Sequence, residues 1–183
     1  MSVLLSSLAI LSVAAATPTC SNNPSFHRFS FGGIQGVVVS DGPALFDVNP
    51  FSVPNAALKR NYDASFRSSS PLVIQQNVAI VDMPAGRVLV DAGSFNIPEF
   101  PQFANAGRLL ANMRAAGIAP ESIQAVVFTH AHADHVAGVI TADGKRAFPN
   151  AHVYIDKVDH EFWTQSNVPN PKPAIIPNAT LGT

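Results

Sequence analysis

Charged side chains are scarce in this chain. Lys and Arg number 11 against 12 Asp and Glu, so the formal net charge is −1, and charged residues make up 13% of the 183 residues. A near-neutral balance gives no electrostatic reason to expect nucleic acid or an anionic membrane as a partner. Globular chains carry about 25% charged residues, so we expect part of this surface to be covered.

Cysteine and long apolar runs are also scarce. Cys20 is the single cysteine, so no disulfide can form within the chain. The apolar run from Val3 to Ala16 is shorter than the ~20 residues of a membrane-spanning helix. Its end matches the A-x-A pattern of a signal-peptide cleavage site. We expect residues 1–16 to be a secretory signal peptide and the mature protein to be secreted, without a stable membrane anchor; a buried helix and an uncleaved anchor are the alternatives.

Apolar patterns predict the first structural elements after this leader. A strand centred on residues 37–40 is expected to end at the turn pair Asp41-Gly42, before a long irregular segment over residues 43–71. The runs "NVAIVDM" and "RVLVDAGS" flank Pro84-Ala85-Gly86 and predict a hairpin.

Helical and strand patterns alternate in the rest of the chain. Apolar spacing predicts a helix over residues 102–117 that stops at Gly117, and "IQAVVFT" predicts a strand buried on both faces. A short helix, a strand at "AHVYI" and a helix from Asp156 to Trp163 are expected next. From Val168 onward no element is visible. The alternation predicts a mixed α/β (α+β) fold with strands in the middle.

The stretch "THAHADH", residues 129–135, carries the clearest chemical signal. It holds three of the six histidines and one aspartate. His130 and His132 are alternate residues at a strand end, so both imidazoles can point at one cation. Asp134 and His135 lie where the loop enters the next helix and can face a second point nearby. This arrangement suits two metal ions about 3.5–4 Å apart that share a water or hydroxide.

The donor atoms indicate the metal and the reaction. Imidazole with carboxylate favours zinc, with manganese, iron or cobalt as alternatives. Water bound to such an ion has a pKa of about 7, so hydrolysis of a carbonyl or phosphoryl centre is expected. Asp91 ends the strand "VLVDAGS", where it can hydrogen-bond a ligating imidazole or simply belong to the strand-end turn. The alternative without metal is a polar loop whose histidines cap the next helix.

Two stretches together resemble the metallo-β-lactamase superfamily. Residues 129–135 match its T-H-x-H-x-D-H signature, and residues 88–93 match the strand-Asp-x-Gly element that precedes it. The segments "VVVSDG", "RAFPNAHVYI" and "DHEFW" resemble the secreted branch that contains methyl parathion hydrolase and quorum-quenching lactonases. The resemblance extends from about residue 28 to about residue 165, which we expect to be one metallo-β-lactamase-like domain.

This resemblance implies an αββα sandwich, in which two sheets pack face to face with helices outside. It implies that His130 and His132 hold the first zinc ion of a complete two-metal site, and that Asp134 and His135 hold the second. Asp134 would also orient or deprotonate the bridging water, and Asp91 would support the site. Metal-bound hydroxide would then attack a small-molecule ester, lactone or phosphotriester.

By this resemblance, we expect the second half of the family's fold to be missing from this sequence. The family takes two more histidines and a bridging aspartate from that half, yet no histidine follows His160. Each metal would keep two protein ligands, where catalytic zinc normally has three. We expect residues 28–165 to be the first αβ half of the sandwich and residues 166–183 an irregular tail.

Three explanations are open for a half-domain of this kind. The chain is a fragment or truncated gene product of a metal-dependent hydrolase, a half-domain that assembles with another chain, or a non-catalytic metal-binding or interaction protein. The sheet face that normally meets its partner would then be exposed and apolar, which predicts self-association through it.

Overall fold

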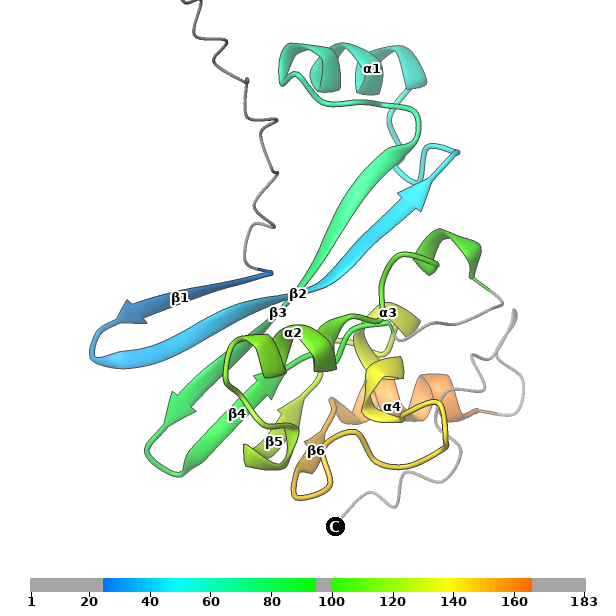
Figure 1. Ribbon diagram of the computed structural model, residues 1–183. Coiled ribbons are helices and arrows are strands. Elements are labelled where there is room, and N and C mark those ends of the chain that lie inside the picture. Colours follow the sequence, from blue (N-terminus) through cyan, green and yellow to red (C-terminus); the bar gives the residue numbers. More distant parts are fainter. Residues whose placement is uncertain (1–24, 95–99, 166–183) are drawn as a thin grey trace, which may run out of the picture.

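The computed structural model describes residues 25–94 and 100–165. The predicted signal peptide and the predicted tail lie outside these ranges. Within them the strands form one six-stranded sheet in the order β1-β2-β3-β4-β5-β6 (Figure 1). No helix in the described part of the chain is long and apolar enough to cross a membrane.

The sheet has an antiparallel and a parallel part. β1 to β4 pair as antiparallel neighbours, whereas β5 runs parallel to β4 and β6 runs parallel to β5. The strands are β1 (Phe26–Phe31), β2 (Ile34–Phe46), β3 (Leu72–Met83), β4 (Gly86–Val90), β5 (Ile123–Val127) and β6 (His152–Tyr154).

Helices follow each strand of the parallel part, which confirms the predicted α/β layering. The α-helices are α1 (Asn55–Ala64), α2 (Leu109–Ala115), α3 (Ala133–Val136) and α4 (Lys157–Thr164), and the 3-10 turns are η1 (Pro101–Phe103), η2 (Pro120–Ser122) and η3 (Ala137–Val139). α1 stands at the far end of the long β2–β3 ribbon, away from α2, α3 and α4 (Figure 1).

The hydrophobic core lies on one face of the sheet. Val37, Ile80, Leu89 and Val126 are aligned across β2 to β5 and are 0–5% exposed. Leu109 and Met113 of α2 belong to the same cluster of buried side chains. Burial of these aligned apolar side chains under α2 is therefore the main stabilising interaction of the described structure.

The opposite face carries apolar side chains that remain partly exposed. Val38, Ala79, Val90, Val127 and Tyr154 form the next aligned row across β2 to β6. Val127 is 38% exposed and Tyr154 is 56% exposed. The prediction that "IQAVVFT" is buried on both faces is therefore wrong, because no second sheet packs on this side within residues 25–94 and 100–165. We call this row, with Val81 and Val88, the open face.

The predicted turn at Asp41-Gly42 is also wrong. β2 continues to Phe46 through a register shift between Ser40 and Gly42, where Gly42 has φ 112°. A positive φ at glycine suits a β-bulge as well as a turn. The bulge turns Asp41 into the core, where its carboxylate is 1% exposed.

Asp41 then joins three segments of the covered side of the sheet. Its carboxylate accepts hydrogen bonds from the Ser94 backbone N–H and hydroxyl at 2.8 Å, from the Gly107 N–H at 3.2 Å and from the Leu109 N–H at 3.0 Å. A buried carboxylate is tolerated only with such partners. Asp41 thus attaches the loop after β4 and the start of α2 to β2.

Two further predictions are wrong in part. Residues 43–71 are not wholly irregular, because β2 extends to Phe46 and α1 begins after Pro54. The helix expected over residues 102–117 is reduced to α2 with η1 before it, because Gly107 has φ 76° between them.

The other local predictions are confirmed. β3 and β4 form the hairpin around Pro84 and Ala85, α3 is short, and β6 and α4 follow in the expected order. Gly117 ends α2 with φ 74°. Asp156 caps α4 and accepts the Val158 N–H at 2.8 Å.

Candidate metal centre

The histidine cluster lies at the carboxyl edge of the parallel strands. Val90 at the end of β4 pairs with Val127 at the end of β5, so Asp91 and the stretch 129–135 leave the sheet side by side. The Ala92 N–H donates to the His135 carbonyl at 2.7 Å and joins the two segments further. Ligand sites in open α/β sheets lie at this edge.

Asp91 connects the two segments through its side chain. It is 9% exposed and has φ 62°. Its carboxylate accepts hydrogen bonds from the Thr129 N–H at 2.8 Å, the Thr129 hydroxyl at 2.9 Å and His135 Nδ1 at 2.8 Å. Burial raises the pKa of Asp91, but the hydrogen bonds from His135 and Thr129 outweigh it and hold the pKa below its ordinary value.

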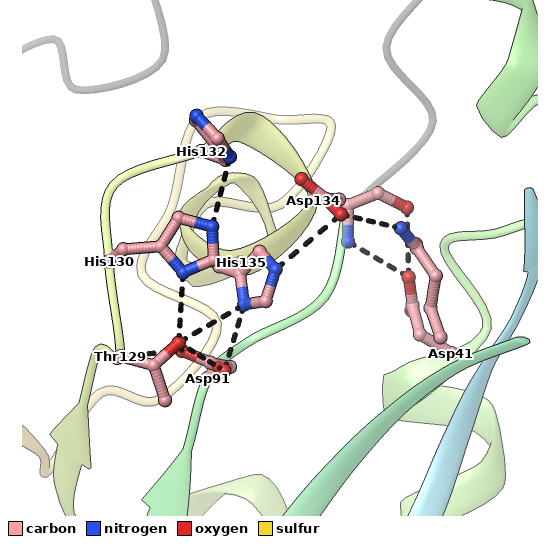
Figure 2. A network of polar contacts seen from close by, with 9 residues as sticks. Asp41, Asp91, Thr129, His130, His132, Asp134 and His135 are labelled. Atoms are coloured by element: carbon pink, nitrogen blue, oxygen red, sulfur yellow. Dashed lines mark hydrogen bonds and ion pairs between the residues drawn. The ribbon is translucent and has the colours of Figure 1, made fainter. Parts of the chain in front are cut away.

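The four predicted ligands lie together as two pairs (Figure 2). His130 Nε2 is 2.9 Å from His132 Nδ1, and His135 Nε2 is 3.5 Å from Asp134 Oδ2. The pairs adjoin each other, because the ring centroids of His130 and His135 are 3.9 Å apart. The structure therefore brings together all four residues predicted as ligands, with Asp91 beside them.

Two of these histidines have shifted pKa values. Burial lowers the pKa of His130, and the nearby His135 and His132 lower it further. The hydrogen bond to Asp91 raises the pKa of His135, and the charge of Asp134 adds to this effect. Neutral imidazole is the form that binds metals, so the lowered pKa of His130 favours it as a ligand, whereas the raised pKa of His135 favours the charged form more than in an ordinary histidine.

The candidate ligands are arranged to hold a cation as pairs. Two nitrogens bound to one tetrahedral zinc ion, each at about 2.05 Å, would lie about 3.3 Å apart, close to the 2.9 Å between His130 and His132. Asp91 holds His135 through Nδ1, which leaves Nε2 for a ligand. No group of three or more His, Cys, Asp or Glu in residues 25–94 and 100–165 is arranged to hold one ion.

Three contributors to the site were missed in the sequence. Gln76 of β3 donates from Nε2 to Asp134 Oδ2 at 3.0 Å. The Trp163 ring of α4 packs edge-on against His132 at 5.7 Å between centroids. Thr129 holds Asp91. Thr129 lies next to the histidines and Trp163 ends the segment "DHEFW" quoted for the resemblance, whereas no sequence pattern pointed to Gln76.

A small cavity adjoins the Asp134–His135 pair. Its volume is about 200 Å³. The lining residues come from β3, from the end of β4 and from α3, and include Ile74, Gln76, Val78, Asp91, Asp134 and His135. The lining thus combines apolar residues of β3 with polar residues of the candidate metal centre.

Comparison with known proteins agrees with this geometry. Residues 72–178 match the family model of the metallo-beta-lactamase superfamily. The chain belongs to the metallo-β-lactamase superfamily. The resemblance read from residues 88–93 and 129–135 is thereby confirmed.

Solved structures of metallo-β-lactamase-like enzymes share the fold. The dizinc quorum-quenching lactonase AidC, solved with a product, is 27% identical with a TM-score of 0.67, over 76% of this chain and 47% of AidC. The hydrolase AbOPH of the beta lactamase superfamily is 25% identical with a TM-score of 0.69, over 80% of this chain and 49% of AbOPH. The chain spans about half the length of these structures.

A more distant structure extends the comparison of the fold alone. A Staphylococcus aureus protein described as "a probable metal-dependent hydrolase" superposes with a TM-score of 0.64 at 19% identity, over 76% of this chain and 53% of that one.

Proposed function

We propose that this chain supplies the metal-binding edge of a hydrolase for small-molecule esters, lactones or phosphotriesters. The observation that carries the proposal is the pairing of His130 with His132 and of Asp134 with His135, with the second pair beside a cavity. The likeness to a quorum-quenching lactonase at 27% identity supports the lactone as one substrate class.

Each side chain has a defined role in this proposal. His130 and His132 hold one divalent cation, and Asp134 and His135 hold a second, with zinc favoured over manganese, iron or cobalt. When bound, such cations act as Lewis acids and lower the pKa of a water to about 7. Asp91 orients His135 through Nδ1.

Asp134 is also placed to move a proton. Its Oδ2 is engaged by Gln76 at 3.0 Å and by His135 at 3.5 Å. Held in this way, the Asp134 carboxylate is proposed to orient or deprotonate a water in the cavity that it lines. General-base chemistry of this kind contributes about 10²–10⁴-fold to a rate.

The cavity supports a small and partly apolar substrate. Its volume of about 200 Å³ is below the roughly 300–1,000 Å³ of complete ligand pockets. Ile74 and Val78 offer an apolar wall for an acyl or alkyl group, and the near-neutral charge of the chain gives no support to a nucleic-acid substrate.

Cation binding by the purified full chain tests the proposal. The chain is stripped with a chelator and titrated with Zn²⁺ by calorimetry, and hydrolysis of a lactone, an aryl ester and a phosphotriester is then measured. We expect binding that His130→Ala and Asp134→Asn weaken at least about tenfold. His27→Ala is the matched control, because His27 is exposed on β1. Equal binding by wild type and both site variants would refute the proposal.

A second function is favoured by a specific observation. Since no three candidate ligands in the described ranges are arranged around one ion, the chain is also a candidate non-catalytic metal-binding or interaction protein. This function predicts cation binding without turnover of any of the three substrates. Turnover that is lost on chelation and restored by Zn²⁺ would exclude it.

Secretion is the remaining part of the proposal. Removal of residues 1–16 would release a chain that begins at Thr17. N-terminal sequencing of protein recovered from the medium of expressing cells tests this start, and an intact Met1 on cell-associated protein would contradict it.

A further inference from the structure

Gln76 reaches the candidate metal centre from a strand with no ligand of its own. It lies on β3, 58 residues before Asp134, and donates from Nε2 to Asp134 Oδ2 at 3.0 Å. Gln76 is half-buried and lines the cavity with Asp91 and His135. Its amide therefore contacts a proposed ligand at the oxygen that also lies 3.5 Å from His135 Nε2.

The other end of the same amide is left without a partner. Gln76 Oε1 is buried and accepts no hydrogen bond within the described residues. Buried polar atoms are nearly always hydrogen-bonded, so an exception calls for an explanation beyond stability. A glutamine placed only to stabilise the fold would have both ends satisfied.

The charge of Asp134 explains the orientation of this amide. If the amide were reversed, Oε1 would face Asp134 Oδ2, and two acceptors would meet without a proton between them. A hydrogen bond to a carboxylate is roughly twice as strong as one between neutral groups. Gln76 thus keeps its bond to Asp134 even though its oxygen stays unpaired.

We propose that Gln76 is a positioning residue for Asp134, which sets how tightly the Asp134–His135 pair binds a divalent cation. By holding Oδ2, Gln76 restricts rotation of the carboxylate and leaves Oδ1 for the ion. A neutral amide suits this role because it keeps the negative charge of Asp134, whereas Lys or Arg would neutralise it and repel the cation. This inference rests on the proposed function of the site.

Calorimetric titration of the full chain with Co²⁺ alone tests the role of Gln76. Gln76→Met keeps the length of the side chain and removes the donor. We expect the affinity of the Asp134–His135 pair to fall about 10–100-fold, with binding at His130 and His132 retained. Gln35→Met is the matched control, because Gln35 donates a similar hydrogen bond, to Ser30 Oγ at 2.9 Å, at the opposite end of the β2–β3 ribbon.

A double-mutant cycle and thermal unfolding separate positioning from stability. In an Asp134→Asn background, Gln76→Met should change Co²⁺ affinity by no more than about twofold. Without cation, Gln76→Met should unfold at the wild-type temperature or higher, because it removes a buried acceptor together with the donor. If Gln76→Met does not fold, Gln76→Leu replaces it, since leucine also removes the donor, adds no charge and should lower the affinity in the same way.

The outcomes distinguish this inference from the proposed function. A wild-type chain that binds no Co²⁺ overturns both. A wild-type chain that binds, with Gln76→Met or Gln76→Leu binding as tightly, overturns the role of Gln76 alone. A lower unfolding temperature for Gln76→Met with unchanged affinity shows a structural glutamine and equally overturns it.

Discussion

Both faces of the sheet carry apolar side chains, but one face is covered and the other is partly exposed. Leu89 and Val126 on the covered face are 0% exposed, whereas Val127, the next residue along β5, is 38% exposed on the open face. Adjacent residues of a strand point to opposite faces. A strand that is apolar at every position is therefore suited to burial on both faces. Within the described ranges, one face of the sheet is covered.

The difference between the faces shows which apolar side chains are buried by other parts of this chain. The covered face is closed by α2 and tied to it through Asp41. The open face has no such layer within residues 25–94 and 100–165. Substitutions on the two faces should therefore cost different amounts of unfolding free energy.

Leu89→Ala should have the largest effect. Leu89 is fully buried under α2, and truncation of such a leucine costs about 2–5 kcal/mol of unfolding free energy. Val90→Ala on the open face should cost about 1 kcal/mol or less, because Val90 is only half-buried. Urea unfolding of both variants at low protein concentration measures the contrast, and equal losses would show that the open face is covered.

Asp41→Ala should lower the free energy of unfolding nearly as much as Leu89→Ala. It would leave the N–H groups of Ser94 and Leu109 buried without acceptors, at a combined cost of about 2–4 kcal/mol. Asp82→Ala is the control, because Asp82 pairs with Arg87 in a largely exposed ion pair that is worth less than about 1 kcal/mol. Thermal unfolding compares the two, and a small loss for Asp41→Ala would contradict the anchoring role.

A charge on the open face should change assembly rather than stability. We expect the wild-type chain to self-associate through this face, and Val127→Asp to shift it toward the monomer, because burial of an unpaired carboxylate opposes association. Light scattering across a range of concentrations measures the mass. Val48→Asp is the control, since Val48 is 74% exposed away from the sheet face. A monomeric wild type at every concentration would rule out self-association.

Asp91→Asn should destabilise the fold less than Leu89→Ala or Asp41→Ala, with a defined pH dependence in cation-free protein. The pKa of His135 is raised from 6.5, so its contribution is present below 6.5 and is lost as pH rises through the folded value. The pKa of Asp91 is lowered from 3.8, so its contribution is present above 3.8 and is lost as pH falls through the folded value.

The loss caused by Asp91→Asn should therefore be largest between pH 3.8 and 6.5, at about 1–2 kcal/mol for a charged hydrogen bond. Asparagine tolerates the positive φ of Asp91, so the substitution tests charge and not backbone strain. Unfolding at pH 5 and at pH 8 measures the difference, and an equal loss at both would speak against the ion pair.

Local patterns were enough to predict much of the fold. The β3–β4 hairpin, α3, β6 and α4 follow from apolar periodicity, turn residues and the cap at Asp156, which act over a few residues. The prediction failed at Asp41-Gly42, because a turn and a bulge both accept glycine with positive φ. It also missed α1, whose single buried residue Leu58 leaves little apolar periodicity to detect.

The sequence by itself determined the four candidate ligands, the superfamily and the order of strands and helices from β3 onward, because these depend on residue type and short spacing. Only the tertiary structure decided that Asp91 holds His135, 44 residues away, and that Gln76 holds Asp134, 58 residues away. It also decided which face of the sheet is covered. These contacts depend on strand register and on the layer that packs against the sheet, and neither is encoded within one segment of the chain.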